Sequence, residues 1–382
     1  MTPAARVQAA IGILDAIGDG MPAEKALTGW ARRSRFAGSG DRAAVRDHVF
    51  DVLRARRSLA ALAGGREDGR ALMWALMSRE GIDPQTVFIG GAYGPAPLDA
   101  DEIHPASASD AIDLPEWLIP VLRADLGADF AATEQALRQR APVMIRVNLR
   151  KTSRAQAVDL LAGDGIEAEP CEIAPTALRL GQGARKLAQT AAYRDGLVEL
   201  QDGSSQGAMQ MLDIAPGARV LDYCAGGGGK ALALAARVDA RFFAHDVDPA
   251  RMSDLPARAA RAGVAIQCVD GDDLSREAAF DVVLCDVPCS GSGTWRRAPD
   301  AKWRFTPERL AELTAMQDDI LDRASRMTGR LVYATCSLLS AENQDRISAF
   351  LRRHPGWTVA FSHNWPVSDA GDGFFVAQLD RE

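Results

Sequence analysis

Two cysteines stand where thiol chemistry is plausible. Residues 280–285 form an apolar run that predicts a buried strand, and the run ends in the carboxylate of Asp286. Cys289 follows on a loop rich in Ser and Gly. A second predicted strand, residues 330–335, is followed by Cys336 in the same manner. Because cysteines directly after two strand ends are unusual as core filling, this arrangement indicates thiol chemistry.

A glycine-rich turn follows another predicted strand, residues 219–223. The turn comprises Cys224, Ala225, Gly226, Gly227, Gly228, Gly229 and Lys230, and an Ala/Leu-rich helix comes next. Four glycines let the backbone bend sharply and approach a ligand that faces the helix N-terminus. Ala231 excludes the phosphate-loop pattern, which requires Ser or Thr after the lysine. A tight structural turn is the alternative interpretation.

Acidic residues after the next strands favour a cofactor. Asp246 lies about twenty residues beyond the glycines, where a carboxylate can accept both hydroxyls of a ribose. Asp272 follows a third strand and is placed to contact an adenine amino group. Carboxylates at successive strand ends suit a positive sulfonium and would repel a pyrophosphate. The pattern therefore favours S-adenosylmethionine over a dinucleotide.

The apolar periodicity divides the chain into four parts. Residues 1–90 show helical spacing, and residues 91–112 are rich in Gly, Pro and polar side chains, as in a linker. Residues 113–203 predict two helices and then a small α+β unit. From 204 to 382, strand and helix signals alternate, which predicts a mostly parallel sheet with helical crossovers. The strands are expected at 218–223, 241–246, 264–269, 281–286 and 330–335, with an added antiparallel strand at 374–379 after an Asp-Gly turn.

The composition excludes several classes of protein. The 382 residues carry a net charge of −7, which argues mildly against coating nucleic acid by charge alone, although residues 1–60 contain ten Lys or Arg against six Asp or Glu. Six scattered cysteines form neither a disulfide framework nor a zinc motif. No signal peptide or membrane-length apolar run is present. We expect a cytoplasmic monomer that binds no metal and no membrane.

The motifs carry a resemblance to a known family. Several stretches resemble those of the Nop/Sun-domain RNA cytosine-5 methyltransferases, most closely the bacterial Fmu/RsmB branch that modifies small-subunit ribosomal RNA. They are residues 201–206, 221–230, 286–293, 296–297, 299–300, 302–303, 333–337 with 342–343, and 372–375. The resemblance is strong over 195–382 and weaker towards the N-terminus, which is similar to a helical NusB-type domain that we expect to bind RNA. It implies a Rossmann-like class I methyltransferase domain, α/β with a mostly parallel sheet, after a small α+β unit and an all-helical domain.

The resemblance also implies roles for the site residues. Cys336 matches the nucleophile that adds to carbon 6 of cytosine, which makes carbon 5 able to attack a sulfonium methyl group. Cys289 matches the cysteine that helps to break the covalent adduct. Asp286 would hold the base near N3 beside the cofactor. One departure is visible: the family usually has Ala-Pro where this chain has Gly226 and Gly227, and losing the proline makes the free loop more flexible.

A basic segment close to Cys289 is a candidate for substrate contacts. Its cations are interleaved with Trp295 and Trp303, so it offers phosphate contacts and stacking surfaces for an extruded base. The cations are Arg296, Arg297, Lys302 and Arg304. A charged loop that packs on the core is the alternative interpretation. The remaining thiols Cys171, Cys268 and Cys285 are expected to fill the core.

Three rival functions were weighed. An amino-group methyltransferase would carry Asp/Asn-Pro-Pro and an aromatic residue, but here Cys289 follows Pro288. A transfer-RNA cytosine-5 methyltransferase keeps the chemistry with another substrate. A ribosome-assembly factor that binds RNA without turnover is supported only by the altered glycine loop. Ribosomal RNA, 16S rRNA in particular, is the expected substrate, and transfer RNA stays open.

Overall fold

The computed structural model describes residues 1–102, 110–274, 277 and 279–382 and divides the chain into two compact units. A helical unit comprises Met1–Arg140 together with Trp295–Arg304. A sheet unit comprises Ala141–Thr294 and Phe305–Glu382. No helix among the described residues is long and apolar enough to cross a membrane.

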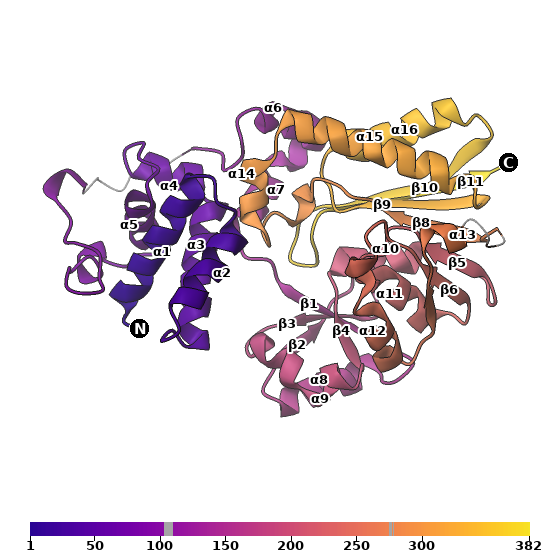
Figure 1. Cartoon of the computed structure of the whole chain (residues 1–382), viewed down its shortest axis with the longest axis horizontal. Coiled ribbons are helices and arrows are strands. Elements are labelled where there is room, and N and C mark those ends of the chain that lie inside the picture. The colour runs from indigo at the N-terminus through magenta and orange to yellow at the C-terminus, as the bar shows by residue number, and fades with distance from the viewer. Residues whose placement is uncertain (103–109, 275–276, 278) are drawn as a thin grey trace. The chain divides into compact units, whose positions relative to one another are not determined.

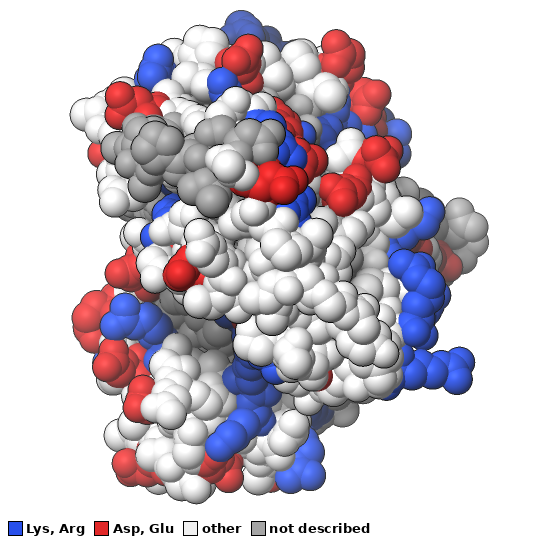
Figure 2. All heavy atoms as spheres, turned by 90° about the vertical axis from the view of Figure 1, so that its left-hand side faces the viewer, with Lys and Arg blue, Asp and Glu red and all other residues white. Residues whose placement is uncertain are grey.

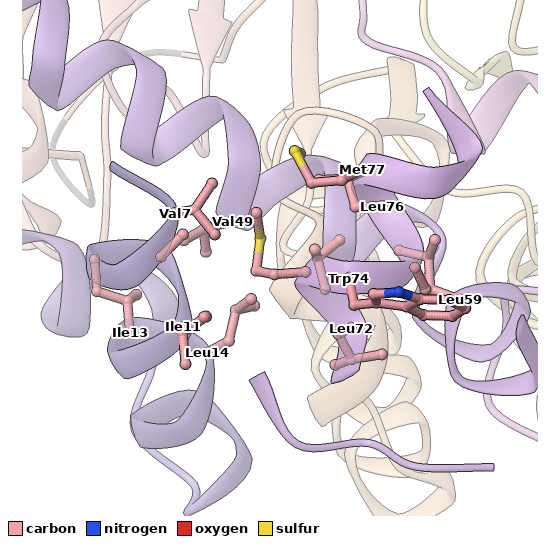
Figure 3. Packing of buried hydrophobic residues seen from close by; sticks show 14 of the residues in the cluster. Val7, Ile11, Ile13, Leu14, Val49, Leu59, Leu72, Trp74, Leu76 and Met77 are labelled. Carbon is pink, nitrogen blue, oxygen red and sulfur yellow. The ribbon is translucent and has the colours of Figure 1, made fainter. Parts of the chain in front are cut away.

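The helical unit is built from amphipathic segments around one apolar core. Thr2 caps the first helix and Pro3 occupies its first position, where the missing N–H costs nothing. Figure 3 shows Val7, Ile11 and Leu14, spaced by about one helical turn, among the buried side chains that pack together. The helices are α1 Pro3–Gly18, α2 Ala23–Arg33, α3 Ser39–Arg54, α4 Arg56–Leu62, α5 Gly69–Arg79, α6 Leu118–Leu126, α7 Phe130–Arg138 and α14 Pro299–Arg304, with short 3-10 turns at Pro84–Thr86, Ala100–Glu102 and Gly127–Asp129.

The helical unit differs from the expected division of the chain. By their contacts, the helices between residues 113 and 140 lie in the helical unit, whereas the sequence pattern groups them with the α+β unit. The segment Trp295–Arg304 also belongs to this unit, although the chain around it belongs to the sheet unit. Both differences depend on long-range packing that local periodicity does not record.

The sheet unit begins with a four-stranded antiparallel sheet in the order β2-β3-β1-β4. Ser153 and Gln156 form a reciprocal capping box that starts α8. This confirms the small α+β unit that the sequence predicts from residue 141. Its elements are β1 Val143–Val147, α8 Arg154–Gly163, β2 Ala168–Pro170, β3 Ala177–Leu180, a 3-10 turn Ala184–Gln189, α9 Ala191–Arg194 and β4 Val198–Leu200.

A seven-stranded sheet follows in the order β10-β11-β9-β8-β5-β6-β7 (Figure 1). The five strands from β9 to β7 are parallel, and β10 and β11 add antiparallel pairing at one edge. The sequence predicts the parallel strands and β11, whereas β10 was not predicted. The strands are β5 Arg219–Asp222, β6 Arg241–Ala244, β7 Ile266–Cys268, β8 Val282–Asp286, β9 Arg330–Thr335, β10 Trp357–Trp365 and β11 Phe374–Arg381.

Both faces of this sheet are covered, which explains why its central strands are continuous apolar runs. Leu221, Val283 and Leu331 enter one apolar cluster, and their neighbours Val220, Leu284 and Val332 enter another. The helices are α10 Gly203–Met211, α11 Gly229–Arg237, α12 Leu255–Ala262, α13 Gly271–Leu274, α15 Pro307–Ala324 and α16 Gln344–Arg353, with 3-10 turns Pro249–Met252, Ser292–Thr294 and Ser340–Glu342. Because parallel strands end at one edge, the loops after β5, β6, β8 and β9 share that edge, where ligands of such sheets bind.

Candidate active site

The structure brings the two predicted cysteines together. Strands β8 and β9 are parallel neighbours, and Asp286 pairs with Ala334 at their carboxyl ends. The loops that follow the two strands therefore begin side by side at the same edge of the sheet. The Sγ atoms of Cys289 and Cys336 consequently lie 3.4 Å apart, although the residues are 47 positions apart in sequence.

Backbone contacts hold the Cys289 loop against the Cys336 loop. The N–H of Gly293 donates to the carbonyl of Cys336 at 3.0 Å, and the N–H of Gly373 donates to the carbonyl of Gly293 at 3.1 Å. A Cβ at residue 293 would lie 2.1 Å from the carbonyl oxygen of Gly373, so only glycine allows this approach. The Cys289 loop and the Asp-Gly turn at residues 372–373 therefore pack against each other in one site.

A buried glutamate ties the two loops together from behind. Glu342 is fully buried; its Oε1 accepts from the N–H of Ser290 at 2.8 Å and from Nε2 of Gln317 at 3.0 Å. Its Oε2 accepts from the hydroxyl of Ser337 at 2.6 Å and from that of Ser290. Sequence reasoning assigned Glu342 no role, although it belongs to the segment after Cys336 that resembles the family. The only signal was a carboxylate close to a strand-end motif.

The contact between the thiols changes the ionisation of Cys289. The hydrogen bond with Cys336 and burial together raise the pKa of Cys289 well above its ordinary value. Cys289 is therefore harder to ionise than an ordinary thiol, and either sulfur can be the donor in the contact between them.

The glycine loop links β5 to α11 next to these thiols. Gly228 forms the N-cap of α11 with a positive φ of 73°, and a Cβ there would lie 2.3 Å from Cδ1 of Leu255. The ammonium of Lys230, one residue into the helix, lies 2.5 Å from Oδ2 of Asp286. Burial lowers the pKa of Lys230, but its ion pair with Asp286 outweighs this and raises the value overall. The loop and the strand end at Asp286 are thus joined by a half-buried ion pair.

The expected ribose carboxylate is present but engaged by the protein. Asp246 is 2% exposed; its Oδ2 accepts from the N–H of Gly226 at 2.8 Å, and its Oδ1 accepts from that of Asp248 at 3.0 Å. Arg251 also contacts Asp246, at 3.0 Å. Asp272 belongs to α13, but its side chain lies outside what the structure describes.

The acidic surroundings of the loop suit a cationic ligand. Asp222 is 3% exposed, and burial, followed by the charge of Asp286, raises its pKa to about 7. Lys230 already offsets part of this repulsion through its pair with Asp286, and a sulfonium near the two carboxylates would offset more of it. The carboxylates present therefore fit the sulfonium of S-adenosylmethionine.

A cavity of about 550 Å³ joins the loop to the thiols. Its volume falls in the range typical of small-molecule sites. Of the predicted residues, it is lined by Cys224, Ala225, Gly226, Gly227, Gly229, Lys230, Asp286, Cys289 and Cys336. Gln201, Arg251 and Arg258 also line it and were not predicted. Among the described residues, no group of His, Cys, Asp or Glu could hold a metal ion.

The basic segment corrects the expectation of direct substrate contacts. Lys302 is 1% exposed, and its ammonium donates to the carbonyls of Arg54 at 2.9 Å and Asp113 at 2.7 Å within the helical unit. Arg296 is 2% exposed, and its carbonyl accepts from Arg54. Neither cation is available to a phosphate in this structure, because packing in the helical unit buries both.

The other members of that segment divide in the same way. Trp295 is buried, so it offers no stacking surface to a base. The indole N–H of Trp303 donates to the carbonyl of Leu53 at 2.7 Å. Arg297 and Arg304 are exposed, and Arg304 lies 3.6 Å from Asp300. These two arginines are the only members of the predicted set of four whose exposure allows contact with RNA.

The remaining thiols confirm one expectation and correct two. Cys285 is fully buried in the sheet core, as predicted. Cys268 ends β7, the last strand of the sheet, and is exposed, while Cys171 is half-buried. An edge strand is covered less well than a central one, which explains the exposure of Cys268.

Comparisons with known proteins agree with this architecture. Residues 209–380 match the family described as 16S rRNA methyltransferase RsmB/F, and residues 114–185 match the ferredoxin-like domain of RsmF/B-like methyltransferases. Ribosomal RNA small subunit methyltransferase B from Citrobacter koseri and its counterpart from Yersinia pestis are each 36% identical over 285 residues. Each match covers 70% of this chain and 66% of the relative, so the matched region spans about two thirds of these relatives.

Solved structures support the fold. PH0851 is similar with a TM-score of 0.76 over 100% of this chain and 99% of that chain, at 22% identity. NSun6 from Pyrococcus horikoshii, solved with SFG, is similar with a TM-score of 0.63 over 70% of this chain and 98% of that chain, at 18% identity. At these identities the structures speak for the fold alone. The matches in sequence show that the chain belongs to the RsmB/F family of methyltransferases.

Proposed function

We propose that this protein transfers a methyl group from S-adenosylmethionine to carbon 5 of a cytosine in RNA, with 16S ribosomal RNA as its substrate. The observation that carries the proposal is the pair of thiols 3.4 Å apart, lining one cavity with the glycine loop and Asp286. The family and the names of the relatives support an rRNA methyltransferase. The thiol pair supports cytosine-5 chemistry, because carbon 5 needs covalent activation and an amino-group acceptor would not.

The residues can divide the work as follows. Cys336, as the thiolate, bonds to carbon 6 of the ring, while Asp286 holds the base at N3, which takes up a proton from the ion pair of Lys230 with Asp286. The electron pair then becomes available at carbon 5, to which the bound cofactor supplies the methyl group. A water molecule then takes the proton from carbon 5, which re-forms the double bond between carbons 5 and 6. The carbon 6–sulfur electron pair returns to Cys336 as the thiolate, and N3 returns its proton to the pair of Lys230 with Asp286. Cys289 is the group beside Cys336 that assists this release.

The chain's own residues also fit the cofactor. The backbone of the glycine loop and its N–H groups can approach the cofactor closely. Cys224, Ala225 and residues 226–230 would surround it. Asp246 would accept hydrogen bonds from the ribose hydroxyls after its hydrogen bond from Gly226 and its ion pair with Arg251 are broken. Asp272 remains a proposed contact to the adenine. We propose that Arg297 and Arg304, rather than Arg296 and Lys302, contact the RNA backbone.

Bisulfite sequencing of 16S rRNA and tRNA, from cells with and without the gene, tests the function. We expect one or more resistant cytosines in 16S rRNA to disappear when the gene is removed and to return with the wild-type gene. If resistant cytosines disappeared only from tRNA, the substrate would be tRNA and not 16S rRNA. If they disappeared from neither RNA, an assembly factor without turnover would be favoured. Calorimetry with S-adenosylhomocysteine separates this last case, because an assembly factor need not bind it.

A further inference from the structure

Two of the four glycines in the cofactor loop, Gly226 and Gly228, are required by the backbone, and the other two are not. Gly226 and Gly228 have positive φ angles of 49° and 73°, which side chains rarely tolerate. Gly227 has no positive φ. Its limit is space: a Cβ there would lie 2.8 Å from Nη1 of Arg258. The missing side chain at 227 therefore makes room for an arginine.

Arg258 reaches the loop from α12. Its Nη1 donates to the carbonyl of Gly227, and its Nη2 lies 3.6 Å from Oε1 of Glu199 on β4. The Arg258 side chain is 22% exposed and that of Glu199 11% exposed. The planar guanidinium can hold two partners in one geometry, so Arg258 connects the loop to a carboxylate of the small antiparallel sheet.

We propose that Arg258 is a positioning residue for S-adenosylmethionine, which acts by holding the glycine loop in its binding conformation. A run of four glycines has many conformations to lose when a ligand binds. A restraint on the carbonyl of Gly227 removes part of that freedom beforehand, which strengthens binding in addition to any contact that Arg258 makes with the ligand in the cavity. The proposal rests on the proposed function only in the identity of the ligand.

The test compares Arg258→Ala with Arg261→Ala in the full-length protein. Arg261 lies one turn further along α12 and binds the same Glu199, at 2.6 Å, but has no bond to the loop. Isothermal titration uses two ligands, S-adenosylhomocysteine and 5′-methylthioadenosine, which lacks the amino-acid part. We expect R258A to raise the Kd of both ligands about tenfold, the loss typical of a charged hydrogen bond. R261A should leave both Kd values unchanged.

Hydrogen–deuterium exchange of the loop amides, residues 226–230, gives a readout without ligand. We expect faster exchange in R258A than in the wild type or R261A. Unchanged exchange would overturn the proposal. A Kd that rises only for S-adenosylhomocysteine would also overturn it, because it would reveal direct contact with the amino-acid part. If the wild type bound neither ligand, the proposed function would fail and Arg258 could not position S-adenosylmethionine, although faster exchange in R258A would still show that it restrains the loop.

Discussion

At the scale of single residues, the contact between Cys289 and Cys336 is the feature on which the proposed chemistry depends. Both follow a strand end, and both line the same cavity. The shared hydrogen bond and burial raise the pKa of Cys289 well above its ordinary value. The division of roles between the two sulfurs comes from the resemblance, which assigns the nucleophile to Cys336.

The two cysteines should therefore give different phenotypes. Cys336→Ala removes the bond-forming sulfur, so methyl transfer from radiolabelled cofactor to 16S rRNA should fall below detection. Cys289→Ala keeps the first step but slows release, so a covalent protein–RNA species should accumulate on a denaturing gel. Cys268→Ala, at an exposed thiol on the sheet edge, serves as the control and should retain normal turnover. Near-normal turnover in C336A would exclude it as the nucleophile.

At the scale of elements, the site depends on two loops held in register by Glu342. Each carboxylate oxygen accepts at least two hydrogen bonds, from the Cys289 loop, from the Cys336 loop and from α15. Such a buried network is costly to leave partly satisfied. The thiol separation therefore depends on a residue that touches neither the base nor the cofactor.

Replacing Glu342 with Gln tests this dependence. The new amide NH₂ must face either Ser290 N–H or the serine hydroxyls, so at least one donor loses its acceptor, at a cost of about 1–3 kcal/mol. We expect a lower melting temperature and a lower kcat, with little change in the Kd of S-adenosylhomocysteine. Arg323→Ala, which breaks an exposed pair on α15, is the matched control. A kcat equal to that of the wild type would show that the loops keep their register without the carboxylate.

The sequence predicts the elements of the site better than its supporting contacts. Strands β8 and β9 were predictable because continuous apolar runs mark a sheet covered on both faces, and a parallel sheet places Cys289 and Cys336 at one edge. Arg258 and Glu342 were not predicted, because their roles depend on partners far along the chain, including Gly227 and Ser290. Lys302 was misassigned because a lysine in a charged loop gives no local signal that it is buried.

At the scale of the whole molecule, the helical unit is completed by a segment from the middle of the methyltransferase sequence. Residues 295–304 contribute α14, which packs against α3 of the same unit. The buried ammonium of Lys302 binds two carbonyls there, at Arg54 and Asp113. The N-terminal helices therefore depend on residues more than 150 positions further along the chain. A fragment ending at residue 140 would lack these contacts.

Lys302 makes the stability of the helical unit depend on pH. Burial lowers its pKa from 10.5 to about 7, despite the opposing charges of Asp113 and Glu134. Between these two values the unfolded chain binds a proton that the folded protein does not, so this residue's contribution to stability rises with pH. In that window the slope for one group is about 1.4 kcal/mol per pH unit, and below pH 7 the dependence vanishes.

Urea denaturation of the wild type and Lys302→Met, followed by tryptophan fluorescence, measures this slope. Methionine fills similar space but does not titrate. The free energy of unfolding of the wild type, relative to that of K302M, should therefore rise by about 1 kcal/mol for each pH unit between about pH 7 and pH 9. Other titrating groups are common to both proteins and cancel in the difference. Lys25→Met, at an exposed lysine on α2, should show no such divergence. A constant difference between wild type and K302M across this range would mean that Lys302 stays charged when folded, held by Asp113 and Glu134 against the cost of burial.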